Sequence, residues 1–395
     1  MILADLLQIL YAPGKAFKKI AENPKYIGAA IVLLIFVLAQ MGAFYSYFST
    51  QRYEAAFPAG TELGQYTQSA SLWTTSPSGV SVTSNAADFI NGSYYGNSSL
   101  QFAVSSSNNI SLTLNANGTA DCSSPGFTEF SMRVKQVDPQ VAPSSVMLYF
   151  YSQNSSENYF SRDITSSFSN ASINVWNNLT LALNSNDWSS NGAAQWGNIT
   201  GLKLTLIYPS SSNITLRLDG MFFRGIFQTV VEASGANFYI FFVQNNVMQF
   251  IIQWLLVTVL IFALIKGLKG TITFKPLMVA VGCTLILLVV QALIALAVST
   301  ILPSVAVPIE AQASIAGEMQ TASITAFQSA LTTFSYIYLA VQVAILAWMV
   351  GLSAIIVRTL TQLPWSKSIL ISAGAWVIAF FVLPYIYALL NVIVL

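Results

Sequence analysis

The sequence has no histidine and few charged residues. Only 8% of its 395 residues are Asp, Glu, Lys or Arg, and 54% are hydrophobic. Soluble domains usually carry about 25% charged residues, so the composition predicts a membrane protein. The absence of histidine excludes HExxH zinc sites and Ser-His-Asp or Cys-His nucleophile systems. The net charge of +1 gives no reason to expect a nucleic-acid partner.

Cysteine is also scarce. Cys122 lies in a polar region and Cys283 in an apolar one, so we expect no disulfide between them. No cofactor is expected from the motifs present.

Five apolar stretches lack Asp, Glu, Lys and Arg and are long enough to cross a bilayer, which needs about 20 residues. They lie near 27–49, 238–265, 277–302, 334–357 and 369–395. We expect an α-helical transmembrane bundle in contact with membrane lipid, with Pro384 kinking the last helix. Amides in the spans are expected to hydrogen-bond between helices rather than to line a permeation path: Gln244, Asn245, Asn246, Gln253, Gln291 and Gln342.

The basic residues give the bundle a direction. Lys and Arg gather before the first span, between the second and third, and between the fourth and fifth: Lys15, Lys18, Lys19, Lys25, Lys266, Lys269, Lys275, Arg358 and Lys367. The loop 303–333 carries only Glu310 and Glu318. The positive-inside rule then predicts a multi-pass cell-membrane protein with a cytoplasmic amino terminus and an extracytoplasmic carboxyl terminus. The opening MILADLLQIL is expected to be retained, because lysines follow it rather than precede it.

Three regions follow from this topology. Residues 1–50 would form a cytoplasmic interfacial helix and the first span, 51–235 an extracytoplasmic β-sandwich, and 236–395 four further spans. The outer region is rich in Ser, Asn and Thr, and its apolar residues alternate at 130–134, 179–183, 202–208 and 214–218. This alternation predicts an all-β antiparallel sandwich. The loop 308–330 is expected to form an amphipathic helix against that sandwich.

Nine Asn-x-Ser/Thr sequons fall in the same outer region, and we expect some to be glycosylated. They are Asn91, Asn97, Asn109, Asn117, Asn154, Asn170, Asn178, Asn198 and Asn213. Low lysine and abundant Asn, Ser and Thr suggest an archaeal host.

A candidate ligand face lies at 146–151. Met147, Tyr149 and Tyr151 alternate with apolar residues predicted to face the core, and Tyr159 and Trp188 are candidates to join them. Aromatic faces stack on sugar C–H groups, although Tyr and Trp also favour strands for packing alone. A second candidate is a structural calcium site at Asp88 and Asp219, the alternative for Asp219 being a turn before Gly220.

A glycosidase would need two carboxylates flanking one bond. The outer acids are scattered without a paired spacing, so no enzymatic activity is expected: Glu129, Asp138, Glu157, Asp163 and Asp187.

The run 175–225 resembles the carboxyl-terminal half of a carbohydrate-binding-module-like jelly roll of the galactose-binding type. The matching residues are Trp176, Trp188, Trp196, Gly201, Asp219 and Gly220, and DFINGSYYGNSSLQFAV at 88–104 resembles the opening of such a domain. The resemblance implies that Trp176 and Trp196 lie in the core. Some members of this class bind sugars, and others only pack or bind proteins.

The segment 6–34 resembles the amino-terminal region of the Yip family of five-span membrane proteins, whose first outer loop is short. The matching residues are Leu6, Leu7, Leu10, Pro13, Phe17, Ile20 and Pro24. From the residues alone, Leu6, Leu7 and Leu10 share one helical face, and Pro13 interrupts the helix. The apolar side beside lysines predicts an interfacial helix held by lipid burial and anionic headgroups.

The sequence therefore predicts a non-enzymatic membrane protein whose sandwich binds glycan, cell-envelope material or a protein partner. The alternatives are an accessory subunit of a membrane assembly and, less favoured because the spans carry no charge, a channel or transporter.

Overall fold

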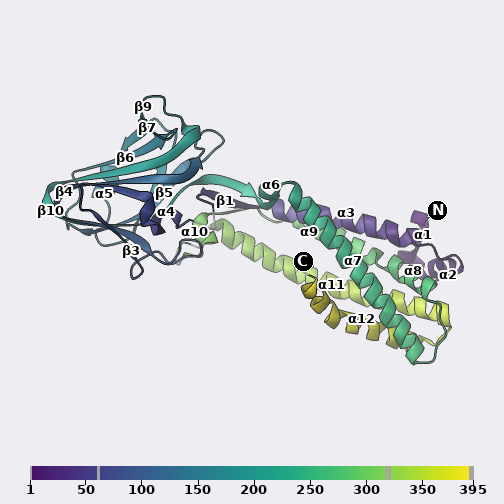
Figure 1. Cartoon of the computed structure of the whole chain (residues 1–395). Helices are drawn as coiled ribbons and strands as arrows, with labels where there is room; N and C mark the ends of the chain where they lie inside the picture. The colour runs from purple at the N-terminus through teal and green to yellow at the C-terminus, as the bar shows by residue number, and fades with distance from the viewer. Residues whose placement is uncertain (1, 60–62, 316–317, 319–321, 391–395) are drawn as a thin grey trace. The chain divides into compact units, whose positions relative to one another are not determined.

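The computed structural model describes residues 2–59, 63–315, 318 and 322–390. The chain divides into two units (Figure 1). The helical unit contains Met1–Gln51, Thr229–Val305 and Thr325–Leu395, and the sandwich unit contains Arg52–Gln228 and Ala306–Ile324. The predicted sandwich bounds of 51–235 therefore omit one segment, 306–324, which lies between the third and fourth apolar helices.

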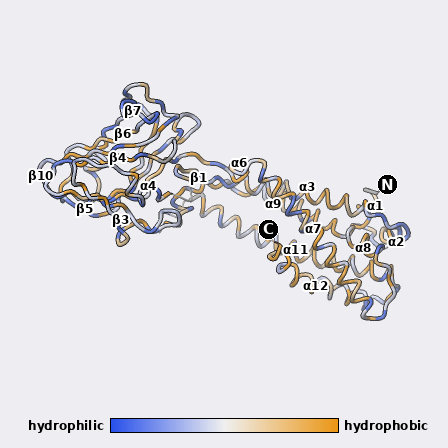
Figure 2. The backbone as a smooth tube through the Cα atoms, in the orientation of Figure 1, coloured by the Kyte–Doolittle hydropathy of each residue, from blue (hydrophilic) through white to orange (hydrophobic). Residues whose placement is uncertain are grey.

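Among the described residues, the helical unit contains five helices long and apolar enough to cross a membrane, as predicted. Figure 2 shows their mostly hydrophobic sequence. The helices are α3 (Ile27–Ser49), α7 (Ala236–Gly267), α8 (Phe274–Thr284) with α9 (Ile286–Ser299), α11 (Ala322–Thr361) and α12 (Trp365–Leu389), which contains Pro384. The short α6 (Val230–Ser234) precedes α7. It starts with a capping box, in which Thr229 and Glu232 satisfy each other's backbone N–H groups.

Polar contacts join some of these helices. Gln291 of α9 donates to the Tyr338 hydroxyl of α11 at 2.9 Å, which confirms one predicted interhelical amide bond. Asn246 behaves differently, because its amide donates to the Phe242 carbonyl of its own helix at 2.7 Å. Two tryptophan N–H groups add contacts between helices, from Trp254 to the Met278 carbonyl and from Trp376 to the Ser353 hydroxyl.

The amino-terminal segment forms two helices, α1 (Ile2–Tyr11) and α2 (Pro13–Glu22), and the predicted break at Pro13 is confirmed. The interfacial position stays a prediction, and part of the apolar side is buried in protein. Leu6, Ile9 and Phe17 are at most 2% exposed and belong to the core of the helical unit. These three residues pack on neighbouring helices, chiefly α8, whereas Leu7 of the predicted apolar face is 52% exposed.

The sandwich unit is built from antiparallel strands. In chain order its elements are β1 (Gln51–Phe57), α4 (Gln65–Gln68), η1 (Ala70–Leu72), β2 (Trp73–Ser76), β3 (Ser81–Asn85), β4 (Ser99–Ala120), β5 (Glu129–Asp138), β6 (Ser145–Ser152), β7 (Ser155–Asp163), α5 (Thr165–Ser169), β8 (Asn177–Ala182), β9 (Ser189–Asn191), η2 (Trp196–Asn198), β10 (Ile199–Thr229), β11 (Val305–Val307) and α10 (Ile309–Gln312).

Two long strands, β4 and β10, hold the sandwich together. They pair with each other along most of their length, with register shifts between Ile207 and Ile214. The first half of β10 pairs with β6, which leads to β7 and β9, and its second half pairs with β5, which leads to β8. Phe130 of β5 and Phe150 of β6 belong to strands that do not pair, yet their rings lie 5.0 Å apart. The two halves are therefore two layers that face one core.

The predicted alternation is confirmed by burial. The inward residues of the four predicted stretches are all less than 9% exposed: Phe130, Met132, Val134, Leu179, Leu181, Leu183, Leu202, Leu204, Leu206, Tyr208, Ile214, Leu216 and Leu218. Both cysteines are free and buried, as expected from their separation.

The segment 306–324 belongs to the sandwich. Ile309, Ala313 and Ile315 are buried in a small cluster with Tyr95 and Phe222. The predicted packing of this loop is confirmed, and the predicted helix is confirmed in part. Among the described residues of 308–330, α10 and the start of α11, from Ala322, are helical, whereas 313–315 and 318 are not.

A buried charge cluster ties this segment to two strands. Arg224 of β10 donates to both carboxylate oxygens of Glu54 on β1, at 2.8 and 2.7 Å, and to both of Glu310 on α10. Arg224, Glu54 and Glu310, here called the Arg224 cluster, are each only 5–8% exposed. Burial alone would lower the pKa of Arg224, but its hydrogen bonds to the two glutamates raise that pKa above its ordinary value. The same bonds hold the pKa of Glu310 below its ordinary value against the effect of burial.

Replacing Arg224 tests this cluster. Removing one partner of a buried ion pair costs about 3–5 kcal/mol, because a charge is left buried without compensation. We expect Arg224→Met to lower the unfolding free energy of the sandwich by about that amount in urea unfolding of the full chain in nanodiscs. Arg162→Met is the matched control, because its pair with Asp187 is 2.9 Å long but less buried, with the Asp187 side chain 60% exposed. Equal effects of the two substitutions would show that the Arg224 cluster does not stabilise the fold.

Candidate functional site

The predicted alternation of β6 is confirmed. Val146, Leu148 and Phe150 are fully buried, and Met147, Tyr149 and Tyr151 alternate with them on the opposite, half-exposed face. This face belongs to the layer formed by β9, β7, β6, the first half of β10, the second half of β4 and β2. The strand register therefore carries three residues of the predicted ligand face to one surface.

Tyr159 joins them from the neighbouring strand. It stands directly opposite Tyr151 in the β6–β7 pair. The Tyr149 and Tyr159 rings lie edge to face, with centroids 5.5 Å apart and planes at 75°. Partial burial, with Tyr149 and Tyr159 close by, raises the pKa of Tyr151. The three tyrosines, here called the tyrosine face, are thus a packed group rather than isolated surface residues.

The three hydroxyls of the tyrosine face have no hydrogen-bond partner among the described residues. Lys203, opposite Tyr149 on β10, holds its ammonium 5.8 Å from the centroid of the Tyr149 ring. Gly201, opposite Tyr151, contributes no side chain to the surface beside that ring. The arrangement offers aromatic surface, free hydroxyls and one cation to a ligand.

Lys203 was missed as a site residue by the sequence reasoning. The alternation of the stretch 202–208 places Lys203 opposite the core side, but the partner strand of that stretch was unknown from the sequence. The signal that identifies Lys203 is the pairing of β10 with β6, which depends on strands about 50 residues apart in sequence.

Hydroxyl groups continue this surface across β10 and β4. Thr113 stands opposite Lys203, and the hydroxyls of Thr205 and Ser111 are 3.0 Å apart. On the other side, Asn191 of β9 stands opposite Tyr159, and its amide donates to the Glu157 carbonyl at 2.7 Å. The tyrosine face therefore has polar residues on both sides.

Trp188 does not belong to this surface, and its prediction as a ligand residue is wrong. Its side chain is buried against Phe150 and Trp196, with ring centroids 5.0 and 5.6 Å away. Its indole N–H donates to the Ala182 carbonyl at 2.8 Å. Trp188 is a core residue, because it packs on the inward-facing Phe150.

The other two tryptophans differ from each other. Trp196 packs against the sandwich core and stacks on Phe160 with centroids 3.9 Å apart, as expected. Trp176 is half-buried, lies outside the core cluster and donates its indole N–H to the Asp88 carboxylate at 2.9 Å. The predicted core position of Trp176 is therefore wrong.

Asp88 is already surrounded by donors. Besides Trp176, its carboxylate pairs with Lys135 at 2.8 Å and with Arg217. Burial would raise the pKa of Asp88, but these bonds lower it overall. Two cationic side chains at this carboxylate disfavour a calcium ion there.

Asp219 is fully buried and also bonded. It accepts from the backbone N–H groups of Ile90 and Gly220 at 2.7 and 2.8 Å, and from the Thr67 hydroxyl at 3.3 Å. Gly220 has φ +49, and a Cβ there would meet the Tyr95 ring at 2.3 Å. These contacts favour the turn predicted as the alternative. Among the described residues no group of three or more Cys, Asp or Glu could hold a metal ion, so the calcium site stays a prediction without support.

The scattered outer acids have separate partners. Asp187 pairs with Arg162, and Asp163 accepts from the backbone and hydroxyl of Thr165. The Oε2 atom of Glu129 lies 3.9 Å from the Nε atom of Arg224. The contacts described here do not join any two of the five acids.

The sequons lie in the sandwich unit. Asn198 is half-exposed, and the side chain of Asn117 lies outside the described residues. The other seven asparagines are exposed: Asn91, Asn97, Asn109, Asn154, Asn170, Asn178 and Asn213. Glycosylation stays a prediction.

A hollow of about 460 Å³ lies elsewhere on the sandwich, lined by residues 122–128 with Leu183, Asn184, Gly225 and Ile226. Burial raises the pKa of the Cys122 thiol in its wall to about 12. A thiol that is not ionised at neutral pH is a poor nucleophile, so this hollow does not suggest cysteine chemistry.

No family model and no curated protein matches the chain, so the Yip resemblance has no support from these comparisons. Solved structures do resemble the sandwich. One belongs to work on promiscuous carbohydrate-binding modules of the β-sandwich superfamily, with 14% identity and TM-score 0.26, covering 39% of this chain and 57% of that one.

A second is the family 11 carbohydrate-binding module of Clostridium thermocellum in complex with a β-1,3-1,4-mixed-linked tetrasaccharide. It has 9% identity and TM-score 0.27, and it covers 43% of this chain and 94% of that one. A third is an exo-β-agarase, with 14% identity and TM-score 0.30, matched over 41% of this chain and 23% of the agarase. Similarity at this level assigns no function to this chain.

The two classes of aromatic residue should respond differently to truncation. Trp188→Ala removes a buried ring, and we expect it to lower the unfolding free energy by about 3–5 kcal/mol. Tyr149→Ala removes a half-exposed ring and should cost less than about 1 kcal/mol. Urea unfolding of the full chain in nanodiscs measures both. A Tyr149→Ala loss as large as that of Trp188→Ala would place Tyr149 in the structural core.

Asp219 predicts a pH effect with a definite sign. Burial raises its pKa from 3.8 to about 6 in the folded protein. The folded state then favours the protonated acid, so the contribution of Asp219 to stability is greatest below about pH 4 and falls as pH rises to about 6. Relative to Asp219→Asn, the wild-type protein should lose stability over this interval, by at most on the order of 3 kcal/mol. A difference that stays constant from pH 4 to 7 would contradict the raised pKa.

Proposed function

We propose that the chain is a non-enzymatic multi-pass membrane protein whose sandwich binds glycan through the tyrosine face. The proposal rests mainly on one observation. Tyr149, Tyr151 and Tyr159 gather on one half-exposed surface with hydroxyls that have no partner among the described residues. Ligand sites combine aromatic surface with a few polar groups that fix orientation, and this surface supplies both.

Each part of the surface has a role in this proposal. The rings would stack on the C–H faces of sugar units, and their hydroxyls would bond sugar hydroxyls. Lys203 and the Thr205 and Ser111 hydroxyls would bond further units along the layer. The topology predicts that this surface lies outside the cell, where envelope polymers are found, and the exposed sequons would be glycosylated there.

A protein partner is the second candidate, and the same observation favours it. Tyrosine is enriched at protein interfaces because it combines apolar area with a polar tip. Under that reading the chain is an accessory subunit of a membrane assembly. A protein that co-purifies stoichiometrically with the full chain in mild detergent, and is lost in the Tyr149→Ala/Tyr151→Ala variant, would support this candidate over glycan.

Binding by the full chain tests the glycan proposal. The chain in nanodiscs is titrated with a panel of envelope polysaccharides and with β-1,3-1,4-mixed-linked glucan, by isothermal calorimetry. We expect Tyr149→Ala/Tyr151→Ala to weaken binding at least tenfold, about 1.4 kcal/mol, because the rings are the central contacts. Tyr149→Phe should weaken it less, since the ring is kept.

Tyr94→Ala is the matched control, because Tyr94 is 48% exposed but lies outside the tyrosine face. It should leave affinity unchanged. No binding to any polymer by a folded wild-type chain, or equal loss with Tyr94→Ala, would overturn the proposal. The complete sandwich includes 306–324. A fragment that ends near residue 230 lacks this segment, so the full chain is used in the binding experiment.

A further inference from the structure

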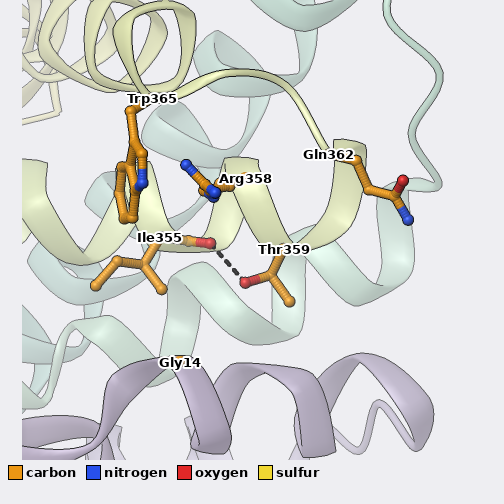
Figure 3. Close-up of a pocket in the computed structure, with 6 residues that line it drawn as sticks. All are labelled: Gly14, Ile355, Arg358, Thr359, Gln362 and Trp365. Atoms are coloured by element: carbon orange, nitrogen blue, oxygen red, sulfur yellow. Dashed lines mark hydrogen bonds between the residues drawn. The ribbon is translucent and has the colours of Figure 1, made fainter.

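A second hollow lies in the helical unit, at the link between α11 and α12 (Figure 3). It has a volume of about 470 Å³ and is lined by Gly14 of α2, by Ile355, Arg358, Thr359 and Gln362, and by Trp365 of α12. Both α11 and α12 are long and apolar enough to cross a membrane. The link between them is therefore where the chain turns back at one membrane surface, at the level of the lipid headgroups.

Arg358 is the charged group of this hollow. Its guanidinium carbon lies 4.5 Å from the centroid of the Trp365 ring, and Figure 3 shows the two side chains next to each other. Arg358 is exposed and forms no ion pair with a described carboxylate. The Thr359 hydroxyl donates to the Ile355 carbonyl at 2.7 Å, so its proton is already used. The guanidinium N–H groups, the Gln362 amide and the Trp365 indole N–H have no hydrogen-bond partner among the described residues, and of these only the guanidinium is charged.

The same end of the helices is strongly basic. With five spans, the amino-terminal segment and the links after the second and fourth spans lie on one side of the membrane. They carry Lys15, Lys18, Lys19, Lys25, Lys266, Lys269, Lys275, Arg358 and Lys367, against the carboxylates Asp5 and Glu22. This excess of positive charge attracts anions, and basic pockets at the ends of spans bind anionic headgroups.

The wall formed by α2 leaves room for a ligand. A Cβ added at Gly14 would meet nothing within 4 Å. The α2 helix itself is fixed, since Ala16 and Phe17 are buried against the helical unit. Gly14 is therefore an open patch on a well-packed helix.

We propose that this hollow binds the phosphate of an anionic phospholipid headgroup. Arg358 would hold the phosphate oxygens through its planar fork of N–H groups. Trp365, which is 48% exposed, would keep the guanidinium in place and lie at the headgroup level, where tryptophan is enriched. The proposal is independent of the glycan proposal, because it concerns other residues in the other unit.

Lipid retention tests the proposal. The full chain is reconstituted in nanodiscs of phosphatidylcholine and phosphatidylglycerol in equal amounts, and the lipids it keeps are counted by native mass spectrometry. We expect the wild-type protein to keep phosphatidylglycerol in preference to phosphatidylcholine. Arg358→Gln should lower the affinity for phosphatidylglycerol more than about tenfold.

Lys367→Gln is the matched control, since Lys367 is an exposed cation next to the hollow but does not line it. It should cost no more than about fivefold, the effect of one surface charge. Arg358→Lys keeps the charge without the planar fork and should fall between wild type and Arg358→Gln. Equal losses in Arg358→Gln and Lys367→Gln would reduce the effect to general surface attraction and overturn the proposal.

Two further measurements complete the test. Gly14→Phe fills the hollow without changing charge and should also abolish the preference, so the result does not depend on one variant folding. Inorganic phosphate at tens of millimolar distinguishes the sources of phosphate. Displacement of phosphatidylglycerol by inorganic phosphate would assign the hollow to a free anion and overturn the lipid assignment, whereas unchanged retention supports it.

Discussion

The sandwich depends on the Arg224 cluster, because it joins three segments that the helices separate along the chain. Glu54 follows the first apolar helix, Arg224 precedes the second, and Glu310 lies between the third and fourth. Burying charges is costly, and the cluster offsets this cost with paired hydrogen bonds from Arg224 to both glutamates. Glu54 also accepts from the backbone N–H groups of Gly225 and Ile309. A second pair, Arg133 with Glu318, repeats the link with bonds of 3.0 and 2.6 Å.

Much of the fold could be predicted because it depends on local patterns. Apolar runs located the five helices, and alternating residues located both the core and the outward tyrosines on β6. Long-range pairing could not be predicted in this way. The residues 306–324 show no alternation, and nothing local in the sequence indicates that Glu310 meets Arg224. Trp188 was misplaced for the same reason, since its burial depends on contact with Phe150 of a distant strand. The buried part of the apolar face of α1 and α2 was assigned to lipid because its protein neighbour, α8, is about 260 residues away.

The two candidate sites have different physical origins. The tyrosine face arises from strand register, which aligns half-exposed aromatic rings on neighbouring strands, with no partner for their hydroxyls in the described part of the chain. The hollow at Arg358 arises where two apolar helices turn back, so that a single cation faces a tryptophan beside an open glycine. The first suits a neutral ligand rich in hydroxyls and C–H faces, and the second suits an anion. Sequence alone indicated the tyrosines but not the hollow, because Gly14, Arg358 and Trp365 come together only through helix packing.

The most direct test of the central claim is hydrogen exchange of the full chain in nanodiscs, with and without a bound polysaccharide. Binding at the tyrosine face should slow exchange in β6, β7 and the first half of β10, covering residues 145–163 and 199–207, and should leave the helical unit unchanged. Protection confined to other parts of the sandwich, such as the hollow at 122–128, or no protection at saturating ligand, would contradict the account.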